Sequence, residues 1–106
     1  MADHSSIYRR LLEAEPQWLR QICRGVEKES LRVSAHQATL AQTPHPVGLG
    51  SALTHSAITT DYSEALLEFI TPVSNSISDT EQALADLHRF TARQLDAELL
   101  WSTSMP

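Results

Sequence analysis

The stretch Arg24-Gly25-Val26-Glu27-Lys28-Glu29-Ser30-Leu31-Arg32-Val33 is the part of the sequence from which the fold can best be predicted. Val26 to Val33 predicts a β-strand after Gly25, although its Glu, Lys, Leu and Arg residues also favour helix. In a strand, Glu27 and Glu29 point to the same face, about 7 Å apart. Lys28 and Arg32 would lie on the opposite face, so an ordinary edge strand with solvated charges stays open as an alternative.

A second acidic stretch follows between residues 58 and 70. The β-branched residues 58–60 predict a short strand, and residues 63–70 predict another, although their propensities are ambiguous. Asp61 lies seven positions before Glu68, so strict alternation would place the two on opposite faces. A bend at Tyr62-Ser63 would bring Asp61 to the side of Glu68.

Carboxylates beside predicted core strands need partners, and this chain has four of them: Glu27, Glu29, Asp61 and Glu68. Two unit charges 4 Å apart repel by about 4 kcal/mol at an effective dielectric constant of 20. Divalent cations would relieve that repulsion, and Mg²⁺ prefers hard oxygen ligands shared with substrate phosphates. The alternative is that all four are solvated surface charges, because a lone Glu-x-Glu pattern is common on exposed strands.

The clearest predicted helix runs from Ile77 to Leu100, with apolar residues at helical spacing. Ser78 and Glu81 form a capping box at its start. Ser5 to Glu15 predicts an earlier helix, and Pro16 can start a further short one.

The composition excludes several classes of protein. The chain of 106 residues is one domain at most, or a piece of a larger one. Its net charge is −5 and its 8 Lys and Arg residues are scattered, so no nucleic-acid partner is expected. No apolar run approaches the roughly 20 residues of a membrane span, and the polar start is unlike a signal peptide. The lone Cys23 excludes an internal disulfide and is expected to be buried. These features favour the cytoplasm.

The acidic strand and the blocks after it resemble the bacterial (proteobacterial-type) glutamate–cysteine ligase family, also called γ-glutamylcysteine synthetase. The similar blocks occur in the same order over nearly the whole chain: Arg24–Val33, Gly50–His55, Ile58–Val73, Asp86–Arg93 and Trp101–Pro106. One departure is the stretch Ser34–Ala38, which lacks the glycine-containing turn expected there.

The resemblance implies an α+β fold, with part of a glutamine synthetase-like antiparallel sheet and flanking helices. It also implies a reaction: ATP phosphorylates the γ-carboxyl of L-glutamate, and the amine of L-cysteine then displaces the phosphate, the first step of glutathione biosynthesis. Mg²⁺, with Mn²⁺ as an alternative, would bridge the phosphates of the co-substrate ATP to Glu27, Glu29, Asp61 and Glu68. No residue is assigned as a general base.

Family enzymes are several times longer than this chain. Residues 1–106 are therefore expected to be a single N-terminal segment of a larger ligase catalytic domain, with the rest of the ligase chain as partner. The ATP and cysteine pockets would lie beyond Pro106, and the isolated chain is expected to be inactive. Two alternatives stay open: a non-catalytic interaction module derived from such a ligase, and another carboxylate–amine ligase of the same fold.

Overall fold

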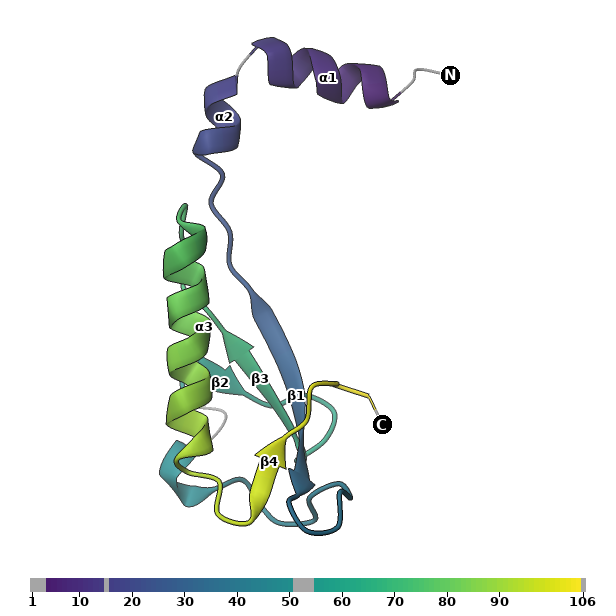
Figure 1. The fold of residues 1–106 in the computed structure, drawn as a ribbon, viewed down its shortest axis with the longest axis vertical. Helices are drawn as coiled ribbons and strands as arrows, with labels where there is room; N and C mark the ends of the chain where they lie inside the picture. The colour runs from purple at the N-terminus through teal and green to yellow at the C-terminus, as the bar shows by residue number, and fades with distance from the viewer. Residues whose placement is uncertain (1–3, 15, 51–54, 106) are drawn as a thin grey trace.

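A twisted antiparallel sheet lies beside one long helix in the computed structural model, which describes residues 4–14, 16–50 and 55–105 (Figure 1). The sheet has four strands in the order β2-β3-β1-β4. Their bounds are Glu27–Ser34 for β1, Ile58–Thr59 for β2, Leu66–Ile70 for β3 and Glu98–Leu100 for β4. The predicted α+β class, with an antiparallel sheet and flanking helices, is confirmed.

The register between β1 and β3 decides what each face of the sheet presents. Glu29 lies opposite Glu68, and Lys28 lies opposite Phe69. Directly opposite residues share a face of the sheet. One face therefore presents Glu27, Glu29, Leu31, Leu66, Glu68 and Ile70, and the other presents Lys28, Ser30, Leu67 and Phe69.

The helix α3, Ile77–Ala92, covers the second of these faces. Buried Ile58, Leu67 and Phe69 form a core with Leu49, and Leu84 and Leu87 of α3 pack against it. Leu49 reaches this core from a single 3₁₀ turn, Val47–Leu49. The first face has no helix on it in the described part of the chain and is called the open face below.

The prediction of one helix from Ile77 to Leu100 is wrong at its C-terminal end. The helix stops at Ala92, and Glu98–Leu100 instead pairs with β1. The sheet hydrogen bonds continue past β4, because the Trp101 amide donates to the Leu31 carbonyl at 2.8 Å. Long-range pairing has overridden local helix propensity.

The capping prediction for this helix is also wrong. The N-cap is Ser76 rather than Ser78, and the Ser76 hydroxyl accepts the Asp79 amide at 3.2 Å.

The N-terminal segment projects away from the sheet (Figure 1). It consists of α1, His4–Ala14, and α2, Pro16–Arg20, which confirm the two predicted helices. The radius of gyration is 18.4 Å, whereas a compact domain of this length has about 13 Å. Cys23 is exposed, so its predicted burial is wrong: no core forms around it in the described structure.

Candidate functional site

Three of the four predicted carboxylates gather on the open face of the sheet. Glu29 and Glu68 are direct cross-strand partners, and Glu27 lies two residues along β1 on the same face. Like charges directly opposite each other destabilise a sheet. Two full charges about 5 Å apart would repel by roughly 3 kcal/mol at an effective dielectric constant of 20. A sheet that keeps such a pair needs a proton or a cation to offset the repulsion.

The fourth carboxylate, Asp61, reaches the same region through a bend. The chain bends at Tyr62, as the sequence predicted, and then turns through residues 64–65 into β3. The Thr60 hydroxyl holds this turn, because its one proton is shared between the Ser63 carbonyl at 2.8 Å and the Leu66 carbonyl at 3.0 Å. Asp61 therefore stays close to Glu68 despite the unfavourable strand alternation.

The electrostatics of Glu68 tie the four residues together. Its pKa is raised above the ordinary value, first by burial and then by the negative charges of Glu27, Glu29 and Asp61. A side-chain hydrogen bond with Glu27 raises the pKa further. Glu68 thus holds a proton more tightly than a free glutamate, and a bound cation would relieve the same repulsion. We call Glu27, Glu29, Asp61 and Glu68 the carboxylate cluster.

The carboxylate cluster is not a preformed metal cage. Across residues 4–14, 16–50 and 55–105, no group of three or more His, Cys, Asp or Glu side chains is arranged to hold a metal ion by itself. Mg²⁺ rarely uses an all-protein cage; it takes one or two carboxylates and completes its shell with waters and substrate phosphates. The donor atoms of the cluster fit that mode of binding.

The opposite face of β1 carries cations in place of carboxylates. The Lys28 ammonium donates to the Ser30 hydroxyl at 2.6 Å, and burial lowers the Lys28 pKa. His88 of α3 meets the Phe69 ring edge-on at a centroid distance of 4.9 Å. Its pKa is lowered by burial and then by Lys28. Strand alternation thus separates the charges of β1 into an acidic open face and a basic helix-covered face.

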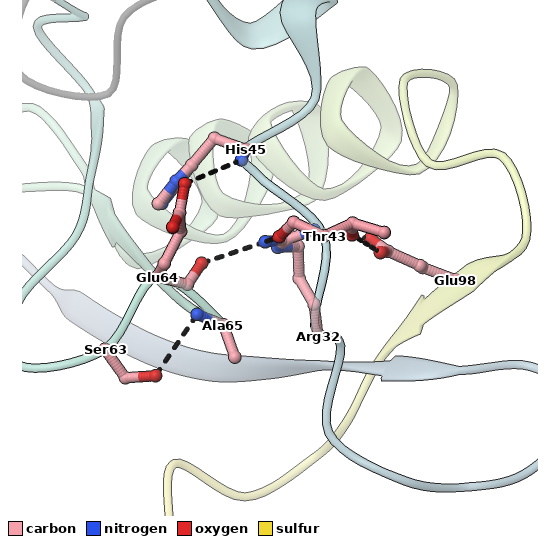
Figure 2. Close-up of polar contacts among 7 residues, drawn as sticks. All are labelled: Arg32, Thr43, His45, Ser63, Glu64, Ala65 and Glu98. Atoms are coloured by element: carbon pink, nitrogen blue, oxygen red, sulfur yellow. Dashed lines mark hydrogen bonds and ion pairs between the residues drawn. The ribbon is translucent and has the colours of Figure 1, made fainter.

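Arg32 rules out the alternative of an ordinary edge strand with solvated charges, because β1 lies inside the sheet and the Arg32 side chain is fully buried. Figure 2 shows its guanidinium between the loop at Thr43, the turn at Glu64 and the strand residue Glu98. No local signal marks Arg32, because its ionic partner Glu98 lies 66 positions away.

A cavity of about 520 Å³ adjoins Arg32, lined by segments that include residues 39–44 and 96–98. Both Arg32 Nη atoms are engaged in internal hydrogen bonds, so the residue is not a free anchor for an anion in this cavity.

Neither loop histidine joins the carboxylate cluster. The His55 Nδ1 accepts the backbone amides of Ala57 and Ile58, both at 3.1 Å. The His45 Nε2 is buried without a hydrogen-bond partner. Burial, followed by the charge of Arg32, lowers the His45 pKa, which favours the neutral ring.

Several proteins resemble this chain in sequence and fold. Residues 9–106 match the sequence profile of the family described as glutamate-cysteine ligase. The chain is 60% identical over 95 residues to a glutamate–cysteine ligase of Sodalis glossinidius; these residues are 90% of the chain and 18% of that protein. The chain thus spans less than a fifth of the length of this relative.

Two solved structures share the fold. One is a glutamate–cysteine ligase from Francisella tularensis in complex with AMP, with 42% identity and a TM-score of 0.67 over 79% of this chain and 17% of that one. The other is a bifunctional glutathione synthetase from Pasteurella multocida, with 34% identity and a TM-score of 0.75 over 91% of this chain and 14% of that one. No helix in the described part of the chain is long and apolar enough to cross a membrane.

Proposed function

The chain belongs to the glutamate–cysteine ligase family, and on that premise we propose that it is a segment of an ATP- and Mg²⁺-dependent ligase. The ligase joins the γ-carboxyl of L-glutamate to the amine of L-cysteine through a γ-glutamyl phosphate, in glutathione biosynthesis. The observation that carries this proposal is the carboxylate cluster, in which the pairing of β1 with β3 sets Glu29 directly opposite Glu68 and Glu27 two residues along the same face. The AMP bound to the Francisella tularensis relative supports a nucleotide as co-substrate.

In this proposal Glu27, Glu29, Asp61 and Glu68 are the ion ligands that the chain contributes. Magnesium, when bound, neutralises negative charge on the phosphates, and phosphoryl transfer asks a protein mainly for positioning and such neutralisation. The pairing of β1 with β3 holds three of the carboxylates at fixed spacing, and the Thr60 turn holds Asp61. No residue of the chain is assigned to proton transfer.

We extend the proposal to the organisation of the protein: residues 1–106 are an N-terminal segment of a larger catalytic domain. The chain spans only 18% of its Sodalis relative. It is also more extended than a compact domain of its length, and α1 exposes Ile7, Tyr8 and Leu11. The isolated chain would then be inactive, and detection of γ-glutamylcysteine formation by the purified chain would refute that part.

A cytoplasmic location belongs to the same proposal, because the thiol of the substrate L-cysteine stays reduced in that compartment.

Charge removal tests the roles of the carboxylates. In the full-length ligase, Glu27→Gln and Glu29→Gln should each lower ligation by about 100-fold or more, the size typical of a lost electrostatic contact in a transition state. Glu81→Gln is the matched control, because Glu81 is an exposed carboxylate on α3. Equal activities for all three variants would remove the case for a metal site on β1.

A second candidate is a non-catalytic interaction module, which the exposed apolar residues of α1 favour. Mixing the chain with the remaining part of the ligase separates the two candidates. Restored ligation indicates a split enzyme, whereas binding without ligation indicates an interaction module.

A further inference from the structure

Arg32 is a charged residue of β1 whose side chain is fully buried. It lies three residues after Glu29 on β1, on the face opposite the carboxylate cluster, and its side chain is 0% exposed. A charged side chain is almost never fully buried unless it is paired. Glu98 supplies the pairing, with its Oε2 2.7 Å from the Arg32 Nη1.

The remaining hydrogen bonds of Arg32 go to two loops that lie far apart in the sequence. Its Nη1 donates to the Thr43 hydroxyl at 3.2 Å, and its Nη2 donates to the Thr43 carbonyl at 2.8 Å. The same Nη2 donates to the Glu64 carbonyl at 2.9 Å (Figure 2). The Thr43 hydroxyl in turn donates to Glu98. The planar guanidinium can engage several acceptors at once in fixed directions, which a lysine cannot do.

The contact to Glu64 connects Arg32 to the carboxylate cluster. The backbone amide of Arg32 also donates to the Ala65 carbonyl, at 2.7 Å. A single residue of β1 therefore fixes two consecutive carbonyls of the turn that follows Asp61, while the Thr60 hydroxyl closes the turn from its other end. The position of Asp61 relative to Glu68 depends on this turn.

We propose that Arg32 is a positioning residue, which acts through the Glu64 carbonyl to hold Asp61 in the geometry needed for ion binding by the carboxylate cluster. This inference rests on the proposed function, because it takes Asp61 and Glu68 as ion ligands. The inference goes beyond the proposed function, because it gives Arg32, on the opposite face of the sheet, a role in ion binding.

The test compares two changes at the same ion pair in the full-length ligase. Arg32→Lys keeps the positive charge opposite Glu98 but removes the planar guanidinium that also reaches the Glu64 carbonyl, whereas Glu98→Gln removes the charge pair and leaves Arg32 to hold Glu64. Mn²⁺ is the probe, with its affinity followed by electron paramagnetic resonance in the presence of ADP. Each variant is measured well below its own unfolding midpoint, which is recorded separately.

We expect Arg32→Lys to weaken Mn²⁺ binding at least tenfold and Glu98→Gln to change it less than threefold, although both lower the unfolding midpoint. Equal Mn²⁺ affinities in the two variants, whether both weakened or both unchanged, would overturn the proposal and leave Arg32 a purely structural role. If Arg32→Lys does not fold, Thr60→Val loosens the same turn from its other end, and an unchanged Mn²⁺ affinity there overturns the proposal as well.

A failure of the proposed function has a different signature. In that case Glu27→Gln and Glu29→Gln would bind Mn²⁺ as tightly as the native ligase does. If those two variants do lose Mn²⁺ while Arg32→Lys keeps it, only the positioning role of Arg32 is refuted.

Discussion

Replacing Glu98 by glutamine should release β4 from the edge of the sheet. The carboxylate lies 2.7 Å from the guanidinium of Arg32, and the two side chains are 15% and 0% exposed. Removing one partner of a buried ion pair costs about 3–5 kcal/mol, because the other charge is left buried without compensation. Glutamine keeps one oxygen as an acceptor, so we expect the lower end of that range, about 3 kcal/mol.

An exposed ion pair of the same length provides the control. Arg89 and Asp86 are 2.8 Å apart on α3, and each is 62% exposed. Such surface pairs contribute about 0–1 kcal/mol. Asp86→Asn should therefore change stability little, although the ion pair that it removes is almost as short as the pair between Arg32 and Glu98.

Native-state hydrogen exchange of the full-length ligase is the assay, with the Trp101 amide as the reporter because it donates to the Leu31 carbonyl just past β4. A loss of about 3 kcal/mol corresponds to roughly 150-fold faster exchange at 1.36 kcal/mol per factor of ten. Acceleration below about fivefold in Glu98→Gln, or equal acceleration in Asp86→Asn, would refute the reasoning that burial gives this pair its strength.

Three further predictions use the same exchange measurement on β1 and β3. Ala38→Gly should stabilise the sheet by about 0.5–1 kcal/mol. Ala38 has φ 53°, where a side chain costs about 1–2 kcal/mol, and the conformational entropy of glycine offsets part of the gain. Faster exchange in the Ala38→Gly variant than in the native protein would contradict this. Phe69→Ala should cost about 3–5 kcal/mol, because the ring is fully buried in the core, and a cost below 1 kcal/mol would disprove its central place there. His88→Leu should reduce the pH dependence of stability. Because the pKa of His88 is lowered in the folded state, the unfolded state binds more protons than the folded state below about pH 6.5. The native protein therefore loses stability as the pH falls below about 6.5. Identical pH slopes in the native and variant proteins would exclude this role for His88.

Local sequence was sufficient for the elements whose pattern is strong and short-ranged. The strand at residues 26–33, the short strand at 58–60 and both N-terminal helices were predictable from propensity and from the flanking glycine and proline residues. The strand predicted over 63–70 had ambiguous propensities and begins later than predicted, because residues 64–65 form a turn and β3 starts at Leu66. The shared face of Glu27 and Glu29 follows from the two-residue period of a strand alone. The bend at Tyr62 was predicted only on the condition that Asp61 joins Glu68, because strict alternation would place the two on opposite faces.

The tertiary structure alone decided the pairings between distant segments. Residues 98–100 carry helix-favouring Glu and Leu, yet they form β4 because β1 offers hydrogen bonds and a buried cation at that edge. The same argument explains Arg32, whose burial depends on Glu98, Thr43 and Glu64 arriving from three separate segments. The sequence by itself placed carboxylates on a strand; the register that sets Glu29 against Glu68 comes only from the fold, because cross-strand pairing is a property of two segments and not of either one.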